Sequence, residues 1–176
     1  MRNPEREAKD LPKGNALRIG VLSDTHHDES AVRRLMERLL ADGPLSALCF
    51  LGDCATDLLA IADCLPASDN TALHAVRGNN DILSALPDER IVCLGGKKLL
   101  LVHGHLQRVK MHRLGLLLHA EESGADVVLF GHTHRQECAY ERGILLLNPG
   151  AACGAHPSCA AITLRGGAVI PAQYCL

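Results

Sequence analysis

The sequence of 176 residues predicts an α/β fold, and three observations indicate this class. In the first half, short apolar runs alternate with amphipathic stretches, a pattern typical of parallel strands joined by right-handed helical crossovers. In the second half, apolar runs are separated by Gly-Gly and Arg-Gly pairs, which favour tight turns between antiparallel strands. Hydrophobic residues make up 47% of the chain and aromatic residues only 2%, so we expect one domain with an aliphatic core.

The first half is expected to contain three strands and two helices. The strands are Leu17–Asp24, Ala47–Asp53 and Ala72–Gly78. Between the first two strands, five apolar residues recur with the spacing of one helical face: Val32, Leu35, Met36, Leu39 and Leu40. Gly43-Pro44 ends this helix, and a second helix, Ala55–Leu65, stops before Pro66.

The second half is expected to add one helix and a mixed sheet. The helix spans Val109–Glu122 and closes at Gly124. Seven strands are predicted: Arg90–Leu94, Lys98–His103, Val127–Phe130, Glu137–Tyr140, Ile144–Leu147, Ala160–Leu164 and Ala168–Pro171. Gly95-Gly96 reads as a hairpin turn. The most economical arrangement packs two sheets face to face with the helices outside.

Composition and charge exclude several classes of function. With 18 Lys and Arg against 20 Asp and Glu, the chain lacks the basic excess of a general nucleic-acid binder. The few aromatic residues leave no platform on which single-stranded bases could stack. No apolar run approaches the ~20 residues that are needed to cross a bilayer. We therefore expect neither a membrane protein nor a nucleic-acid partner.

Residues 1–15 alternate in charge sign and contain no apolar stretch. We expect them to form a solvated extension instead of a secretory signal, so that residues 16–176 form the domain. Without an export route, the eight cysteines are expected to be thiols in the reducing cytoplasm. Cys49, Cys93 and Cys138 lie inside predicted strands, where cysteine behaves as a small hydrophobic residue.

Five short polar blocks each follow a predicted strand. They are Asp24-Thr25-His26, Gly52-Asp53, Gly78-Asn79-Asn80-Asp81, His103-Gly104-His105 and Gly131-His132-Thr133-His134. Ligands of open α/β sheets bind at the carboxyl ends of the strands. The blocks are therefore predicted to converge on one edge although they are far apart in the sequence.

The residue types in these blocks fit divalent metal ions, because neutral imidazole and carboxylate oxygen are ligands for zinc, manganese and iron. Asp24 with His26, and His132 with His134, are spaced to project to one side of an extended segment. The adjacent glycines let the backbone approach a cluster closely.

The charges of such a site favour an anionic substrate. Two divalent ions, the carboxylates of Asp24 and Asp53 and a bridging hydroxide sum to about +1, which would attract a phosphodiester, and a two-metal site lowers the pKa of bound water towards ~7. Neither a G-x-S-x-G elbow nor a G-x-x-x-x-G-K-[ST] loop is present, which excludes nucleotide binding through a P-loop.

The five blocks, in this order, resemble the calcineurin-like metallophosphoesterase superfamily. The compact size and the Leu147-Asn148-Pro149-Gly150 run resemble its small, single-domain prokaryotic phosphodiesterase branch. The resemblance covers about residues 17–170. It implies a four-layer αββα sandwich of two mixed β-sheets flanked by helices, and a dinuclear metal centre. Manganese is the first expectation for the two ions, with iron, zinc, nickel or cobalt as alternatives.

The resemblance also implies how the ligands are shared between the metals. Asp24, His26 and His134 would hold the first ion, and Asn79, His103 and His132 the second. Asp53 would bridge both ions and hold the bridging hydroxide. The implied activity is hydrolysis of a small phosphodiester by this hydroxide.

Two positions depart from the family pattern. Many members have a histidine that protonates the leaving group where this chain has Asn80, and an amide cannot act as an acid near neutral pH. We therefore expect a preference for diesters with acidic leaving groups. Ala151 stands where the family has serine after the Asn-Pro-Gly run, which removes one hydroxyl near the site.

Further residues near the blocks have alternative roles. His105 and His27 would contact substrate or orient a ligand, and Arg77 would pair with phosphate or have a structural role. Asp81 would orient a ligand or cap the next turn. Cys54 adjoins Asp53, but strand alternation should point it the other way.

Two alternative functions remain open at this stage. The retromer subunit of this fold has lost part of its metal site and serves as a protein-binding scaffold, and the superfamily also contains nucleases. Cyclic nucleotides, dinucleotides, other small phosphodiesters and phosphomonoesters are all open as substrates. A homo-oligomer is also compatible with the sequence.

Overall fold

The computed structural model describes residues 16–67 and 70–176, and the predicted extension, residues 1–15, lies outside them. The first sheet has the order β10 (Ala168–Cys175), β9 (Ser158–Arg165), β1 (Leu17–Leu22), β2 (Ala47–Phe50) and β3 (Ala72–Ala75). The second has the order β4 (Glu89–Leu94), β5 (Lys97–Val102), β6 (Val127–Leu129), β8 (Ile144–Pro149) and β7 (Gln136–Glu141). Both sheets are mixed. In the first, β1, β2 and β3 are parallel, and β9 and β10 add antiparallel pairs on one side. In the second, the parallel strands β5, β6 and β8 are flanked by the antiparallel edge strands β4 and β7.

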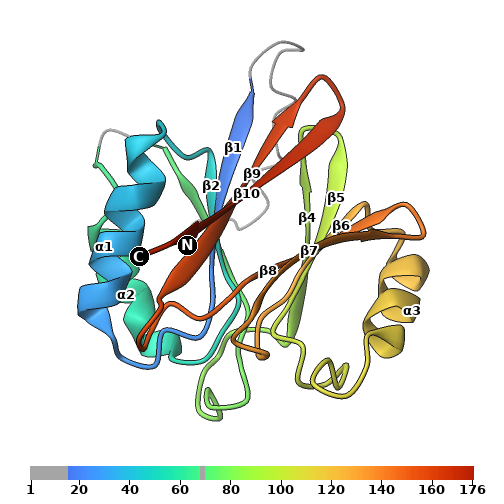
Figure 1. The fold of residues 1–176 in the computed structure, drawn as a ribbon, viewed down its shortest axis with the longest axis horizontal. Coiled ribbons are helices and arrows are strands. Elements are labelled where there is room, and N and C mark those ends of the chain that lie inside the picture. Colours follow the sequence, from blue (N-terminus) through green and yellow to red (C-terminus); the bar gives the residue numbers. More distant parts are fainter. Residues whose placement is uncertain (1–15, 68–69) are drawn as a thin grey trace, which may run out of the picture.

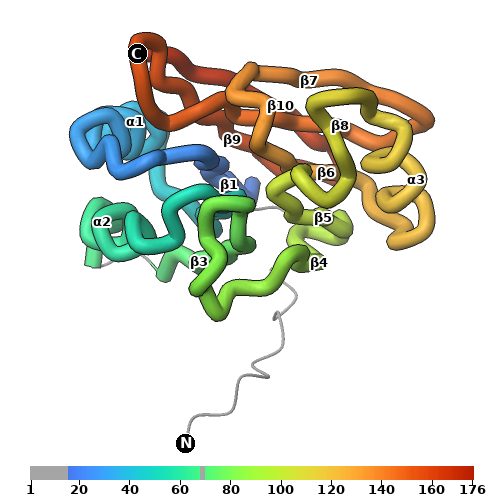
Figure 2. The backbone as a smooth tube through the Cα atoms, turned by 90° about the horizontal axis from the view of Figure 1, so that it is seen from below, coloured from blue at the N-terminus to red at the C-terminus, as the bar shows by residue number. Residues whose placement is uncertain are grey.

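The helices form the outer layers, as Figures 1 and 2 show. α1 (Glu29–Ala41) and α2 (Leu58–Asp63) pack on the first sheet, and α3 (Leu114–Ser123) packs on the second. Between the two sheets lies an aliphatic core that includes Ile19, Leu99 and Leu145. The predicted four-layer αββα sandwich of two mixed sheets is confirmed.

Most of the local signals act as expected. Five residues of α1 are buried, four of them on the predicted apolar face, and Asp28 accepts a hydrogen bond from the Ala31 N–H at its start. Gly124 takes the left-handed conformation that ends α3. Gly95 and Gly96 both have positive φ, as a two-residue hairpin between β4 and β5 requires.

Four expectations need correction. β9 and β10, predicted with the second half, belong to the first sheet: β9 pairs antiparallel with β1 and β10 pairs antiparallel with β9, which makes that sheet mixed. The helix predicted from Val109 begins only at Leu114, because Arg108 has positive φ and the Val109 N–H turns back to the Gly104 carbonyl. The helix predicted from Ala55 begins as a 3-10 turn, since Cys54 has a left-handed φ of 83°.

The fourth correction concerns the cysteines, all eight of which lie in the described residues and are free. Cys49 is buried in β2, as expected of a small hydrophobic residue. Cys93 and Cys138 are exposed instead, because β4 and β7 are edge strands whose outer side chains face solvent.

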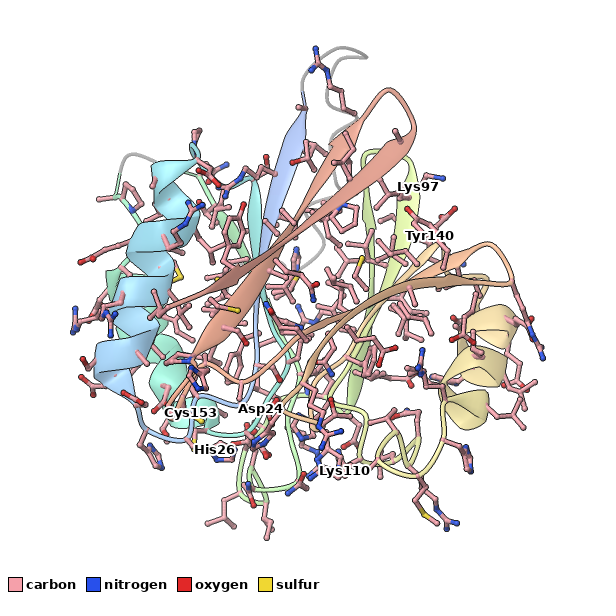
Figure 3. All side chains as sticks on the ribbon, viewed as in Figure 1. Asp24, His26, Lys97, Lys110, Tyr140 and Cys153 are labelled. Carbon is pink, nitrogen blue, oxygen red and sulfur yellow. The ribbon has the colours of Figure 1, made fainter. Side chains whose placement is uncertain are left out.

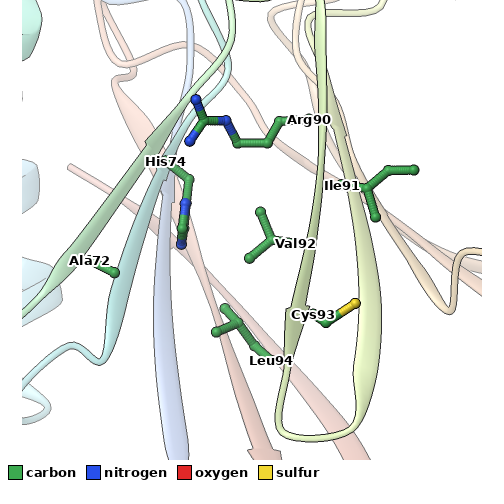
Figure 4. A pocket seen from close by; sticks show the side chains of 7 residues that line it. All are labelled: Ala72, His74, Arg90, Ile91, Val92, Cys93 and Leu94. Carbon is green, nitrogen blue, oxygen red and sulfur yellow. The ribbon is translucent and has the colours of Figure 1, made fainter. Parts of the chain in front are cut away.

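An open hollow of about 550 Å³ lies between β3 and β4, the edge strands of the two sheets. His74, Arg90 and Cys93 line it together with apolar side chains (Figure 4). It contains none of the predicted ligands, so the candidate site lies elsewhere. No helix in residues 16–67 and 70–176 is long and apolar enough to span a membrane.

Candidate metal centre

The five polar blocks come together at one end of the sandwich, beyond the carboxyl ends of β1, β2, β3, β5 and β6. Asp24 and His26 are labelled at this lower end in Figure 3. Both sheets contribute: the hydrogen bond from the His132 N–H to Asp24 Oδ2 measures 3.0 Å, although 108 positions separate these residues. The packing of the sheets thus brings residues from the two halves of the chain to the same place.

The backbone at this end is strained at the predicted ligands. Nine non-glycine residues in the described part of the chain have positive φ, and five of them are predicted ligands: Asp24, His26, Asp53, His132 and His134. Left-handed backbone is costly for residues with a Cβ and concentrates at functional sites. The expectation that the Asp-x-His and His-x-His pairs project from an extended segment is therefore wrong, because both pairs lie in tight turns.

Two glycines leave the space that the cluster needs. A Cβ at Gly78 would overlap with the carboxylate and the backbone nitrogen of Asp53. A Cβ at Gly131 would overlap with the Ser23 hydroxyl and come within 2.8 Å of Asp24 Oδ2. The predicted reason for these glycines, close approach of the backbone, is confirmed.

The first cluster consists of Asp24, His26 and His134. The distance from Asp24 Oδ1 to His134 Nε2 is 3.1 Å, and the Nε2 atoms of His26 and His134 are 3.3 Å apart. The Ser23 hydroxyl and the His132 N–H donate to Asp24 Oδ2, whereas the buried Oδ1 has no hydrogen-bond partner among the residues that the structure describes. An uncompensated buried oxygen that faces two ring nitrogens fits a cation.

The second cluster consists of Asn79, His103 and His132. Because His103 Nδ1 donates a 2.7 Å hydrogen bond to the Leu51 carbonyl, its Nε2 carries the lone pair. That nitrogen lies 3.1 Å from the Asn79 Oδ1 and 3.2 Å from the His132 Nδ1. Burial is the main cause that lowers the pKa of His132 to about 4, so its ring is neutral at pH 7. Converging lone pairs on neutral groups are what a divalent ion requires.

Asp53 lies between the two clusters. Its Oδ2 is 3.9 Å from His26 Nε2 and 3.5 Å from His103 Nε2. Ligand atoms at about 2.0–2.2 Å from a shared ion lie about 3–3.5 Å from one another, which matches most of these spacings. All seven predicted ligands are thus close enough together to surround two ions.

Asn80, predicted as a candidate catalytic residue, holds Asp53 from the other side. Its backbone N–H donates to Asp53 Oδ1 and its side-chain amide to Oδ2, both at 2.9 Å. These bonds orient both carboxylate oxygens. The same residue that replaces the family's histidine therefore has a structural contact with the central carboxylate.

Asp81 has a larger role than the sequence indicated. Its buried carboxylate accepts four backbone N–H groups, from Gly78, Asp53, Cys54 and Ala55, at 2.7–2.9 Å. These bonds outweigh the effect of burial and lower the pKa of Asp81. It joins the turn after β3 to the turn after β2. The acidic position next to Asn80 was the signal available for it.

Two further supporting residues were not identified as such from sequence. Ser23, the last residue before Asp24, holds that carboxylate through its hydroxyl at 2.6 Å. Asn148 donates to the Gly131 carbonyl and the Thr133 hydroxyl, and accepts from the Gly150 N–H. It therefore braces the turn that carries His132 and His134. The Asn-Pro-Gly run was the signal for Asn148, and no pattern pointed to Ser23.

The substrate-contact candidates divide into two groups. His105 lies beside the cluster, with its ring centroid 5.4 Å from that of His103 and a buried Nδ1 that has no hydrogen-bond partner within residues 16–67 and 70–176. Burial lowers the pKa of His105. Arg77 instead forms a two-pronged ion pair with Asp88, at 2.7 and 3.0 Å, which is the structural role considered for it.

His27 is also engaged elsewhere. Its Nδ1 lies 3.1 Å from Asp57 Oδ1, and its side chain is largely exposed. Cys54 lies near these two residues, so the prediction that it points away from the Asp53 cluster agrees with its neighbours.

Comparison with known proteins agrees with this geometry. Residues 17–166 match the family model of the calcineurin-like phosphoesterase superfamily domain. The chain is 33% identical over 135 residues to the probable metallophosphoesterase YsnB of Bacillus subtilis, and the aligned residues cover 77% of this chain and 75% of YsnB. It is 29% identical over 153 residues to the phosphodiesterase MJ0936 of Methanocaldococcus jannaschii, covering 78% and 86% of the two chains.

A solved structure of vacuolar protein sorting 29 from Cryptosporidium parvum has the same fold, with a TM-score of 0.72 and 20% identity over 92% of this chain and 98% of that one. The match of the family model to most of the chain, and the relative in Bacillus subtilis, decide the classification. The chain belongs to the calcineurin-like phosphoesterase superfamily.

Proposed function

We propose that this chain is a metal-dependent phosphodiesterase that holds two divalent ions, with manganese as the first choice. The observation that carries the proposal is the position of Asp53 between two clusters of converging lone pairs. Asp24, His26 and His134 would hold one ion, Asn79, His103 and His132 the other, and Asp53 would contact both. The phosphodiesterase name of the archaeal relative supports the choice of substrate class.

The ions, when bound, would supply Lewis-acid charge and lower the pKa of a coordinated water, as in other two-metal hydrolases. The protein's own contribution is positioning. Asn80 and Asp81 fix the Asp53 carboxylate and its backbone, and Ser23 fixes Asp24. Preorganised groups of this kind cost no reorganisation during the reaction.

The residues around the mouth have distinct roles in the proposal. His105, whose Nδ1 has no partner in the described part of the chain, would donate a hydrogen bond to a substrate oxygen. Arg77 is held by Asp88 and therefore shapes the loop after β3 instead of binding phosphate. Asn80 can donate a hydrogen bond to the leaving oxygen but cannot protonate it.

The test uses purified protein that has been stripped of metal and reloaded with Mn²⁺, assayed on bis(p-nitrophenyl) phosphate. Wild type should hydrolyse the diester, and Asp53→Asn should lose activity by at least about 100-fold together with tight metal uptake. Asp63→Asn, the same change at an exposed helix position, is the matched control and should behave as wild type. Wild-type turnover in Asp53→Asn would show that the centre is assigned wrongly.

A protein-binding scaffold is the second candidate, because the structure of vacuolar protein sorting 29 shares the fold. Metal uptake separates the two functions. If the wild-type chain bound no divalent ion in equilibrium dialysis, the scaffold would be favoured and the phosphodiesterase rejected.

A further inference from the structure

A second set of metal-ligating side chains lies outside the two clusters. His27 Nδ1 is 3.1 Å from Asp57 Oδ1, and the Cys54 sulfur lies with one ligand atom from each of these residues inside a span of 4.8 Å. None of the three belongs to the seven ligands of the proposed dinuclear centre. They come from the loop after β1 and the segment between β2 and α2.

The carboxylate of Asp57 is held so that one oxygen remains available. The Thr25 hydroxyl and the His27 N–H both donate to Oδ2, at 2.5 and 3.0 Å. Oδ1 faces the His27 ring alone among the hydrogen-bond partners in the described residues. Asp57 is buried while the His27 side chain is 71% exposed, so the group opens to solvent on the histidine side.

The backbone directs these side chains away from the dinuclear centre. His27 follows His26 and Cys54 follows Asp53, and both have positive φ, of 64° and 83°. The two neighbours in each pair belong to different groups of ligand atoms: His26 and Asp53 to the proposed dinuclear centre, His27 and Cys54 to the group with Asp57. The two sets are adjacent in the sequence but chemically separate.

The charge around the cysteine favours a cation. The carboxylates of Asp57, Asp81 and Asp53 lie close enough to Cys54 to act on it electrostatically. A divalent ion is attracted by these carboxylates and stabilises a thiolate directly.

We propose that His27, Cys54 and Asp57 form a third metal site that selects Zn²⁺. Imidazole, thiolate and carboxylate are a ligand set that zinc accepts, and the thiolate selects against the hard ion Mn²⁺. Water completes the fourth position. On binding, a sulfur–zinc bond replaces the S–H bond and the proton passes to solvent, so the site is neutral overall.

The site would tie the loop after β1 to the segment after β2. These two segments carry His26 and Asp53, two of the ligands of the proposed dinuclear centre. Zinc at this position would therefore help to fix the backbone that carries these two ligands. The inference does not depend on phosphodiesterase activity, because it concerns ion binding by three other side chains.

The experiment is a Co²⁺ titration of the reduced full-length chain, with Co²⁺ as a spectroscopic substitute for Zn²⁺. A thiolate ligand produces a sulfur-to-cobalt charge-transfer band in the near ultraviolet, which neither histidine nor carboxylate produces. Wild type should show the band, and Zn²⁺ should abolish it. Cys54→Ala should lose the band, whereas Cys153→Ala, a half-buried cysteine at the same end of the molecule, should keep it (Figure 3).

Two further variants keep the result interpretable. His27→Ala changes an exposed side chain and should weaken Zn²⁺ binding by more than about 100-fold, since even residues that only orient a ligand cost about 10–100-fold. Asp53→Asn should lose the dinuclear ions and retain the thiolate band, which distinguishes this site from the proposed phosphodiesterase centre.

Three results would overturn the proposal: wild type shows no thiolate band, the band persists in Cys54→Ala, or the band is lost in Cys153→Ala. A band that disappears in Asp53→Asn would also overturn it, because the ion would then belong to the dinuclear centre. Circular dichroism of each variant confirms that it is folded.

Discussion

Asp81→Asn tests whether one buried carboxylate organises the candidate centre. In the structure, Oδ2 accepts the N–H groups of Asp53 and Gly78, and Oδ1 accepts those of Cys54 and Ala55. An asparagine keeps one of these oxygens. Its NH₂ group replaces the other and then faces two N–H donors, so two hydrogen bonds are lost at nearly unchanged side-chain volume.

The magnitude follows from the type of bond. A hydrogen bond to a charged group contributes about 1.5–3 kcal/mol, so losing two costs about 3–6 kcal/mol of the free energy of unfolding. The total for a domain is only about 5–15 kcal/mol. At about 2–4 °C per kcal/mol for this size, the melting temperature should fall by roughly 6–24 °C.

The assay is urea and thermal unfolding followed by circular dichroism, with EDTA present so that metal binding does not contribute to stability. Asp63→Asn is the matched control, because its carboxylate is exposed and the change should stay within about 0.5 kcal/mol. If Asp81→Asn unfolds at the same urea concentration as wild type, the two hydrogen bonds lost in the variant contribute nothing to joining the turns, and the role given to Asp81 is wrong.

Three other changes test separate parts of the account. Gly78→Ala places a Cβ against the Asp53 carboxylate and backbone nitrogen, so Mn²⁺ affinity in equilibrium dialysis should fall by at least about tenfold. Unchanged affinity would mean that the close packing of Gly78 against Asp53 does not position this carboxylate. Asn80→His adds a group that can protonate a leaving oxygen, so kcat/KM should rise most for aryl diesters whose leaving groups have a high pKa, and an equal effect on all esters would argue against it. The Lys98 N–H and the Lys97 amine lower the pKa of Asp126, so this carboxylate stabilises the fold above the ordinary carboxyl pKa of about 3.9, and the contribution is lost as the pH falls through the lowered pKa. In urea unfolding between pH 7 and pH 3, Asp126→Asn should therefore lose less stability in acid than wild type does. An equal loss in both proteins would contradict the assignment.

Much of the fold could be predicted because local signals agree with the tertiary structure. The apolar face of α1, the Gly95-Gly96 turn and the Gly124 helix end depend on nearby residues only. The partner of β9 depends on which edge of which sheet is free, and spacing carries no information about this. The strand was therefore recognised while its sheet was not.

The candidate centre shows the same division. The seven ligands were visible because each lies in a short polar block that follows a strand and contains glycine or a second ligand. The contacts of Asp81 were not, because they depend on how the turns after β2 and β3 meet. No sequence pattern marked the hydrogen bond from Ser23 to the neighbouring Asp24. Two tertiary contacts were also not predictable from sequence. His27 contacts Asp57, 30 positions further along the chain, and Arg77 pairs with Asp88, 11 positions further along.

The most direct test of the central claim is anomalous X-ray scattering at the manganese edge from crystals of the Mn²⁺-loaded chain. The account predicts two peaks that flank the Asp53 carboxylate, one beside Asp24, His26 and His134 and the other beside Asn79, His103 and His132. A single peak, or peaks that do not contact Asp53, would contradict it.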